Sequence, residues 1–351
     1  MVEKKYIIHQ NQTLLEALTQ INDIREGPLV LFVVDGEDRM VGSLTDGDSR
    51  RALIGGASVN APVVNIMHRD FRALTEGVDY DVRHLHKQRQ NLMHLIPILD
   101  KDRHIIDIID LERFKTKLPI DAVIMAGGKG ERLRPLTEKT PKPLLKVGDK
   151  CIIDYNVDNL IKCGVEHISV TVNYLKEQLE EHYKQHHNGI KVETVREPKF
   201  LGTMGAVQFV PQFYHDTILL MNSDLFTNID FEDFYLHFEE HKADMSAVAI
   251  PYSVSVPYGI FDIKGQRNIQ GILEKPTYNY YANAGIYLIR QEMIEKYLPT
   301  DTFFNATDFM EKLIAEGRNV IRFPLSGYWI DIGNKQEYAK ALDLVKHINN
   351  F

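Results

Sequence analysis

The segment from residue 121 to residue 145 constrains the fold of this chain more than any other. It reads DAVIMAGGKGERLRPLTEKTPKPLL. A run of apolar residues leads directly into Gly127, Gly128 and Gly130, so a buried strand must end in a turn with few Cβ atoms. Backbone N–H groups in such a turn can approach a phosphate chain closely. Compensating charge follows from Arg132, Arg134, Lys139 and Lys142.

Two widespread phosphate-binding motifs do not fit this segment. No Gly-Lys-Ser/Thr follows Gly127 at the step that GxxxxGK[ST] requires. The pattern GxGxxG fails as well, because residue 133 is leucine. The segment therefore predicts a phosphate loop of another kind.

The rest of the second part of the chain, residues 118–351, alternates apolar runs with amphipathic ones. This alternation predicts an α/β architecture. We expect strands at 121–126, 167–173, 190–197, 217–224, 244–252 and 284–290, and helices at 154–162, 175–186, 231–241 and 307–316.

A different module precedes residue 118. The length of 351 residues favours two domains, and the first third contains an internal repeat. Residues 32–48 align with residues 96–112 if one residue is skipped, which places Asp35 over Asp100 and Arg39 over Arg103. Helical patterns precede both copies. The repeat predicts two pseudo-symmetric α/β halves, about 1–66 and 67–117.

The two copies resemble a tandem pair of cystathionine-β-synthase (CBS) domains. The stretch GSLTDGDSRRAL in the first copy is similar to the turn with which that family holds adenosine nucleotides, and the resemblance gives this role to Thr45 and Asp48. The second copy departs from the pattern, with Ile109 and Glu112 expected at those positions. A regulatory nucleotide site and a purely structural or dimerising module both remain open.

Composition limits the function classes. A net charge of −8 argues against a broad surface for nucleic acid or an anionic membrane. The two cysteines, Cys151 and Cys163, form no CxxC pair and are expected to be reduced. No apolar stretch approaches the ~20 residues that span a bilayer, and the first residues lack a secretion signal. We expect a cytoplasmic location.

The whole run AGGKGERLRPLT…PKPLL resembles the signature of the sugar nucleotidyltransferases, and the resemblance extends over essentially all of 119–351. It implies a Rossmann-like mixed-sheet domain whose loop wraps a nucleoside triphosphate (NTP). Arg132 would contact the departing pyrophosphate, and Lys142 would contact the phosphates near the bond that breaks. The loop itself would use Ala126, Gly127, Gly128 and Gly130.

The segment EPKFLGTMGAV is similar to the part of the family that reads the base, which implicates Glu197, Gly202 and Thr203. Guanine presents two adjacent donors that one carboxylate can accept together, whereas uracil or thymine suits an amide better. Glu197 therefore favours GTP. A glutamate that is simply solvated is the alternative.

Two acids in separate motifs are expected to meet through the fold. Asp224 ends the apolar run ILLMNSDLF, and ligand sites of α/β proteins lie at the carboxyl ends of strands. Asp331, in GYWIDIGN, matches the other metal ligand of the family. Mg²⁺ suits one or two carboxylates completed by phosphate and water oxygens.

The resemblance also implies a sugar-phosphate site. Tyr258 and Gly259 would lie against the sugar ring, Glu274 would bind its hydroxyls and Lys275 its phosphate. Further along the chain, Asn283 would contact the sugar and Gly285 would leave room beneath it.

The sequence thus predicts an enzyme that joins an NTP, with GTP first, to a sugar 1-phosphate. A CBS pair fused to this domain resembles the guanylyltransferases that activate glucosamine 1-phosphate for nonulosonic (legionaminic-type) acids. Mannose 1-phosphate, or a reaction with UTP, CTP or dTTP, is the alternative within the class. A nucleotide-sensing regulatory protein without turnover is the alternative outside it. CBS pairs usually associate, so a homodimer through the front module is expected.

Overall fold

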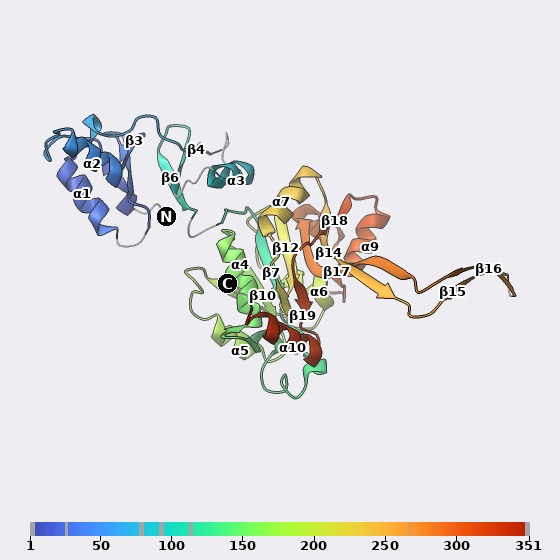
Figure 1. Ribbon diagram of the computed structural model, residues 1–351. Helices are drawn as coiled ribbons and strands as arrows, with labels where there is room; N and C mark the ends of the chain where they lie inside the picture. Colours follow the sequence, from blue (N-terminus) through green and yellow to red (C-terminus); the bar gives the residue numbers. More distant parts are fainter. Residues whose placement is uncertain are drawn as a thin grey trace. The chain divides into compact units, whose positions relative to one another are not determined.

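The computed structural model describes residues 4–24, 27–76, 81–90, 95–111, 115–265 and 267–347 (Figure 1). The chain divides into two compact units. One comprises Met1–Lys117 with Lys162–Gly164, and the other comprises Leu118–Ile161 with Val165–Phe351. In the described part of the chain, no helix combines the length and the apolar character needed to cross a bilayer.

The first unit begins with a three-stranded sheet. Strand β1 (Ile7–His9) runs parallel to β2 (Val30–Val34), and β2 pairs antiparallel with β3 (Met40–Thr45). Two helices, α1 (Leu14–Asp23) and α2 (Asp46–Ile54), complete this half, with the short turns η1 (Lys4–Tyr6) and η2 (Val63–Asn65). Thr13 begins α1 with a capping box that includes Glu16.

The second half repeats this arrangement. Strand β4 (Leu74–Thr75) is parallel to β5 (Leu95–Leu99), β5 is antiparallel to β6 (Ile105–Asp110), and α3 (Val82–Gln90) lies between β4 and β5. Strand order, direction and the position of the β-bulge are the same in both halves. The predicted repeat is therefore present in the fold.

The repeat has a constant offset, which corrects the expected alignment. Arg39 corresponds to His104, because each side chain forms a hydrogen bond with the aspartate four residues earlier in the sequence. The backbones of Arg39 and His104 also pair with each other as an isolated antiparallel β-bridge. Asp38 corresponds to Arg103, since both take a left-handed backbone at the turn. The alignment of the two copies therefore needs no skipped residue in the turn between Asp35 and Arg39. Thr45 accordingly corresponds to Asp110, and not to Ile109; Glu112 lies outside the described residues.

The second unit is built on a seven-stranded mixed sheet of order β11-β10-β7-β12-β17-β14-β18. Four neighbouring strands are parallel, β17 is antiparallel to both of its neighbours, and β18 is parallel to β14. The strands are β7 (Asp121–Met125), β10 (His167–Val172), β11 (Val192–Arg196), β12 (Thr217–Asn222), β14 (Met245–Ser255), β17 (Thr277–Arg290) and β18 (Val320–Pro324).

Both faces of this sheet are covered, because consecutive residues such as Leu219 and Leu220 are fully buried. One face packs on Met204, Met293 and Phe309 of three helices. The helices of the unit are α4 (Ile152–Lys162), α5 (Lys176–His182), α6 (Gly202–Gly205), α7 (Phe231–Glu240), α8 (Gln291–Tyr297), α9 (Ala306–Ala315) and α10 (Lys335–Leu344), with 3₁₀ turns η3 (Glu131–Leu133), η4 (Lys142–Leu144) and η5 (Ala206–Phe209).

Two small ladders lie beside the main sheet. Strand β8 (Lys146–Val147) pairs with β9 (Lys150–Cys151), and β13 (Leu225–Thr227) pairs antiparallel with β19 (Trp329–Asp331). The second ladder joins two segments that are about a hundred positions apart in the sequence. It determines where the residues around Asp224 and Asp331 lie.

Strands β14 and β17 continue beyond the sheet as a two-stranded ribbon. A bulge between Ala247 and Ala249 marks the point where the ribbon leaves, and pairing is then unbroken to Ser255 and Thr277. A separate hairpin of β15 (Ile260–Lys264) and β16 (Asn268–Leu273) lies at its tip. Figure 1 shows ribbon and hairpin projecting away from the sheet.

Candidate active site

The predicted loop lies where the carboxyl ends of the parallel strands meet. Ala126 extends β7 and donates to the carbonyl of Thr171, and Ser223, after β12, donates to the carbonyl of Met125. Glu197, after β11, donates its N–H to the carbonyl of Val172. The ends of four neighbouring strands therefore face one region, as expected for the ligand site of a parallel sheet.

Two glycines of the loop are held in places that a larger residue would not fit. Gly130 has a left-handed backbone with φ of 61°, and a Cβ there would lie 3.1 Å from atoms of both Lys142 and Thr137. A Cβ on Gly127 would lie 2.6 Å from Oε1 of Glu197. Gly128 faces open space. The loop thus packs its backbone against Lys142 and Glu197 and leaves Gly128 exposed.

Asp224 and Asp331 are brought together by the β13–β19 ladder. Leu225 is the ladder partner of Asp331, and the carbonyl of Asp224 accepts from the N–H of Ile332 at 3.1 Å. The two acids, 107 positions apart, therefore lie at one end of the ladder. The indole Nε1 of Trp329 donates to the carbonyl of Ala284 at 2.9 Å, which ties β19 to β17.

Lys142 lies between these acids. Its Nζ forms an ion pair and hydrogen bond with Oδ2 of Asp224, and it lies 3.8 Å from Oδ1 of Asp331. The side chain of Lys142 is only 11% exposed. The adjacent prolines, 141 and 143, fix the backbone around it. A buried ammonium thus lies against two carboxylates next to the glycine loop, and its single charge balances only one of them.

The acid pair fits a hard divalent cation. Oδ1 of Asp224 and Oδ1 of Asp331 are both buried and accept no hydrogen bond from the described residues. Burial raises the pKa of Asp331, and the carboxylate of Asp224 raises it further, while Lys142 and Arg132 act in the opposite direction. Two carboxylate oxygens with no hydrogen-bond donor are a donor set that Mg²⁺ accepts.

Arg132 stands at the edge of this cluster. Its side chain is exposed, and a Cβ built on Gly333 would lie 3.0 Å from Nη2 of Arg132 and 3.4 Å from Oδ1 of Asp331. The guanidinium therefore lies close to the acids while it remains open to solvent. It is available to an anion that enters the site.

Glu197 is a buried carboxylate beside the loop. It is 4% exposed, and its Oε2 accepts no hydrogen bond from the part of the chain that the structure describes. Burial raises its pKa, while the side chain of Thr171 acts in the opposite direction. A carboxylate in this state costs free energy until a donor reaches it. The solvated glutamate, which was the alternative expectation, does not describe this residue.

Gly202 and Thr203 lie against the start of α9. Gly202 has φ of 79°, and a Cβ there would lie 2.7 Å from the carbonyl oxygen of Phe304. Oγ1 of Thr203 accepts from the N–H of Ala306 at 2.9 Å. Both residues thus have packing and capping roles in the structure. Their predicted contact with the nucleotide stays a prediction.

Asn283 and Gly285 lie next to the end of β12. Oδ1 of Asn283 accepts from the N–H of Gly285 at 3.0 Å, and its Nδ2 donates to Oη of Tyr287 at 2.8 Å. Gly285 has φ of 74°, and a Cβ there would overlap the side-chain amide of Asn222. These two predicted sugar residues are therefore near Asp224 in the fold. Asn222 and Trp329 were not assigned roles from sequence, although both lie in the motifs that supplied the acids.

The other four predicted sugar residues lie elsewhere. Tyr258, Gly259, Glu274 and Lys275 flank the hairpin at the tip of the ribbon, and Tyr258 is 74% exposed. Within the described residues, none of the four makes a hydrogen bond or an ion pair with the acid cluster. The structure thus places two of the six predicted sugar residues beside the acids and the other four on the projecting ribbon.

In the front unit, Thr45 and Asp48 bind each other. Thr45 begins α2, its Oγ1 accepts from the N–H of Asp48 at 3.1 Å, and Asp48 Oδ2 accepts from both the N–H and the hydroxyl of Thr45. This capping box is a complete structural role for both side chains. A nucleotide at this turn remains a prediction.

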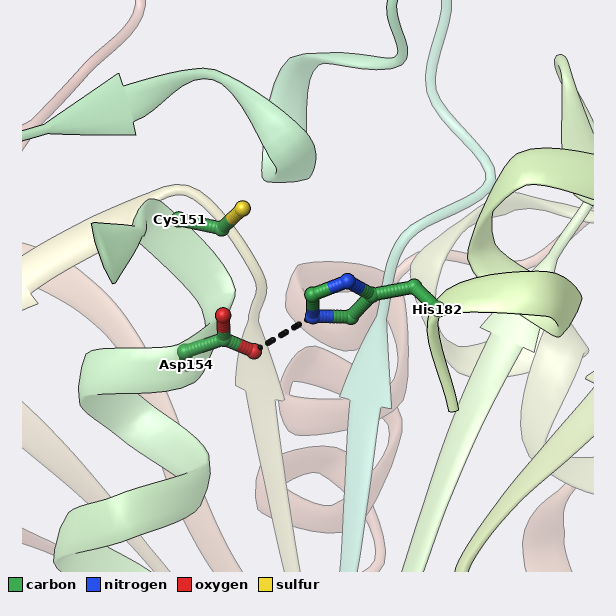
Figure 2. Close-up of side chains that lie close together, drawn as sticks. All are labelled: Cys151, Asp154 and His182. Atoms are coloured by element: carbon green, nitrogen blue, oxygen red, sulfur yellow. Dashed lines mark hydrogen bonds and ion pairs between the residues drawn. The ribbon is translucent and has the colours of Figure 1, made fainter. Parts of the chain in front are cut away.

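A second group of metal-ligand residue types lies at the end of β9, on α4 and on α5 (Figure 2). Ligand atoms of Cys151, Asp154 and His182 lie within 4.8 Å of one another. Oδ1 of Asp154, however, already accepts from His182 Nε2 at 2.8 Å and from the Tyr183 hydroxyl at 2.9 Å. Burial and the charge of Asp154 raise the pKa of Cys151 to about 11, so its thiol stays protonated. These contacts indicate a structural link between the two helices.

Known proteins match the second unit. The profile of the family described as nucleotidyl transferase covers residues 121–347. The catalytic subunit beta of mannose-1-phosphate guanylyltransferase from Danio rerio is 29% identical over 229 residues, which is 63% of each chain. The bifunctional protein GlmU from Methanococcus maripaludis strain C7 is 30% identical over 230 residues, 63% of this chain and 53% of that protein.

Among solved structures, HddC from Yersinia pseudotuberculosis superposes with a TM-score of 0.51 and 25% identity. The superposition covers 64% of this chain and 99% of that one. The chain spans less than two thirds of the length of the two relatives above. Since the family profile covers most of the chain and includes the glycine loop and both acids, this protein belongs to the nucleotidyl transferase family.

Proposed function

We propose that the chain transfers a nucleoside monophosphate from an NTP to a sugar 1-phosphate, and that pyrophosphate is the second product. One observation carries the proposal: Lys142, Asp224 and Asp331 converge beside the glycine loop at the carboxyl ends of the parallel strands. A site that handles two polyanions needs cations and a backbone that phosphates can approach, and this cluster offers both.

The reaction requires neutralisation of phosphate charge, and it does not require a nucleophile from the protein. A phosphate oxygen of the sugar 1-phosphate bonds to the α-phosphorus of the NTP, the bond to the β-phosphate oxygen breaks, and pyrophosphate leaves. The attacking phosphate is already anionic near neutral pH, so no side chain has to remove a proton. Mg²⁺, held by Asp224 and Asp331, would neutralise phosphate oxygens when bound.

The side chains around the acids then have separate tasks. Lys142, released from the acid pair, would bind phosphate oxygens near the reacting centre. Arg132, exposed at the edge, would receive the leaving pyrophosphate. The N–H groups of Gly127, Gly128 and Gly130 would orient the triphosphate, which removes part of the entropic barrier.

For the base, we propose guanine. The buried Glu197 carboxylate has its Oε1 against Gly127 and an Oε2 that accepts no hydrogen bond from the described residues, and the N1–H and N2–H₂ donors of guanine would bind this carboxylate. The Danio rerio relative named above is a guanylyltransferase, which supports the same choice. A reaction with UTP, CTP or dTTP is the alternative.

For the sugar, we propose glucosamine 1-phosphate first, because the front module and the transferase unit occur together in this chain. Mannose 1-phosphate is the second candidate, and it is the substrate in the name of the Danio rerio relative. The amine of glucosamine would need an acceptor in the sugar site; Glu274, predicted to bind the sugar hydroxyls, is a carboxylate that could also accept from it.

A substrate matrix tests both choices. Each of the four NTPs is incubated with glucosamine, N-acetylglucosamine, mannose or glucose 1-phosphate and Mg²⁺, and pyrophosphate release is measured. We expect the highest kcat/KM for GTP with glucosamine 1-phosphate. Pyrophosphate release with another pair would replace the substrates and keep the reaction, whereas none with any pair would favour a nucleotide-sensing protein without turnover.

A further inference from the structure

The projecting part of the second unit has an unusual surface. We call residues 251–265 and 267–281 the arm; it contains the outer halves of β14 and β17 and the β15–β16 hairpin. Eleven of the 21 exposed large hydrophobic side chains in the described part of the chain lie on it. The inner half of β14, in contrast, is buried in the sheet. Such a concentration is far above the scattered exposure of ordinary surfaces.

The ribbon of the arm has one apolar face and one polar face. Residues that are opposite each other in a ladder point to the same side, and the side alternates along each strand. Tyr252 pairs with Tyr280 and Val254 with Tyr278, so these four side chains share one face. All four are exposed, with values from 37% to 57%.

On the opposite face of the ribbon, polar side chains form hydrogen bonds with one another. Ser253 donates to Oδ1 of Asn279 at 2.6 Å, and the hydroxyls of Ser255 and Thr277 lie 3.0 Å apart. This face also carries Tyr281, on whose ring Arg322 stacks at 4.1 Å. The polar face is thus suited to water, and the apolar face is not.

The hairpin at the tip repeats this segregation. Phe261 pairs with Ile272 and Ile263 with Ile269, across a bulge that keeps both pairs on one face. Their exposed fractions lie between 54% and 59%. The other face carries Asp262 and Lys264 together with Ile260 and Leu273. A two-stranded ribbon of this kind is marginally stable by itself in water.

The arm is not positioned to cover its apolar faces with its own sheet. Pairing is continuous from Ala249 with Asn283 to Ser255 with Thr277, so folding the ribbon back would break the ladder. The area is also large. Four of the eight side chains on the two apolar faces are Tyr or Phe rings, and their exposed parts alone offer on the order of 400 Å². A stable interface uses about 800 Å² per partner.

We propose that the arm is a dimerisation surface on which a second copy of this chain packs, apolar face against apolar face around a two-fold axis. The charges of the hairpin favour a copy of itself, because Asp262 is mixed with Lys264 and Arg267. In a pair of arms, each positive side chain can lie near a negative side chain of the other copy. An anionic membrane or a strongly charged partner would instead be matched by an arm with charges of one sign. A two-fold contact uses the same patch twice and closes without further growth.

The test compares neighbouring residues on the two faces in the full chain. Val254→Lys with Tyr278→Lys places charges on the apolar face, and Ser253→Lys with Asn279→Lys places the same charges one residue away on the polar face. The mass of each protein is measured by sedimentation equilibrium over a wide concentration range. Thermal unfolding verifies that each variant remains folded.

We expect the wild-type chain to associate and the apolar-face variant to weaken that association by roughly 100-fold or more, as when interface hot spots are lost. The polar-face variant should associate like the wild type. If the front unit also associates, the wild-type chain should form an oligomer larger than a dimer, and the apolar-face variant should form a smaller one. The proposal is overturned by a wild-type chain that stays monomeric, or by an apolar-face variant that associates as the wild type does.

The tip is tested separately. Phe261→Asp with Ile272→Asp should weaken association as well, because both side chains lie on the apolar face of the hairpin. Asp262→Asn changes the opposite face of the same strand and should not. Equal behaviour of these two variants would remove the tip from the interface.

Discussion

Nζ of Lys142 lies between Asp224 and Asp331: it is paired with Oδ2 of the first and lies 3.8 Å from Oδ1 of the second. The ammonium is therefore the cation that the acid pair holds in this structure. A divalent cation held by the same two carboxylates would compete with it and free Lys142 for phosphate. The same three side chains would thus serve the empty and the loaded enzyme with different partners.

Lys142→Met should abolish most turnover. The variant keeps the length of the side chain and removes its charge, so kcat should fall by ~10²–10³, the scale for one preorganised electrostatic group. It also leaves two carboxylates facing each other, so Tm without Mg²⁺ should fall. Lys146→Met, an exposed lysine four residues later, should retain both activity and Tm. Turnover close to the wild type in Lys142→Met would contradict the assigned role.

Asp331→Asn should separate stability from metal binding. Burial and the charge of Asp224 raise the pKa of Asp331, so at neutral pH this carboxylate is held ionised against its environment. Removing its charge should therefore raise Tm in the absence of Mg²⁺. Adding Mg²⁺ should raise Tm of the wild type and leave the variant unchanged, since one of two ligands is lost. An equal Mg²⁺ effect on both proteins would show that Asp331 holds no metal.

The local parts of this site could be expected from the sequence. An apolar strand before three glycines and acids at strand ends are patterns that short segments carry on their own. The β13–β19 pairing is different, because nothing in WID or LFT specifies a partner about a hundred residues away. Only the family resemblance linked Asp224 with Asp331. The burial of Glu197 likewise depends on Gly127, which approaches it through the fold.

Two further parts of the fold differ from the expectation. The strands were expected to end near residue 252 and to begin near residue 284, whereas residues 253–255 and 277–283 also pair in the ladder. Residues 253–255 alternate Ser with Val, and residues 277–280 alternate Thr and Asn with Tyr. That alternation is the period of a ribbon with one apolar face. In the front unit, the sequence alignment with one skipped residue matched Thr45 with Ile109. The ladder pairing of the two halves shows that Thr45 corresponds to Asp110.

Gly130→Ala should destabilise the loop. The left-handed backbone, with φ of 61°, costs an alanine about 1–2 kcal/mol, and the new Cβ would press on Lys142 and Thr137. Gly128→Ala is the matched control for stability, because its Cβ would meet nothing within 4 Å and its φ is not positive. Chemical denaturation measures both. Equal free energies of unfolding for the two variants would contradict this account of the loop.

Glu197→Gln should change the preference for the base. The amide has nearly the same shape and presents one donor and one acceptor, so it no longer accepts both donors of guanine. We expect kcat/KM for GTP to fall by at least ~10²-fold, because guanine donors would be left unpaired, while that for UTP or dTTP falls less or rises. Competition between GTP and UTP in one reaction measures the ratio. An unchanged ratio would place the base elsewhere.

His187→Gln should flatten the dependence of stability on pH. His187 Nε2 donates to Oδ1 of Asp158 at 2.7 Å, and this hydrogen bond raises the pKa of His187 above its ordinary value of 6.5. A raised folded-state pKa gives stability that is complete below about pH 6.5 and is lost as pH rises through the folded value. Wild-type Tm should therefore decline from pH 6 to pH 8.5 more steeply than that of the variant.

Asp158 keeps Lys150 and Asn188 as partners in the variant, so the fold should persist. His186→Gln, which changes the exposed neighbouring imidazole, should follow the wild-type curve. Parallel curves for wild type and His187→Gln would show that this ion pair contributes nothing to stability in that range.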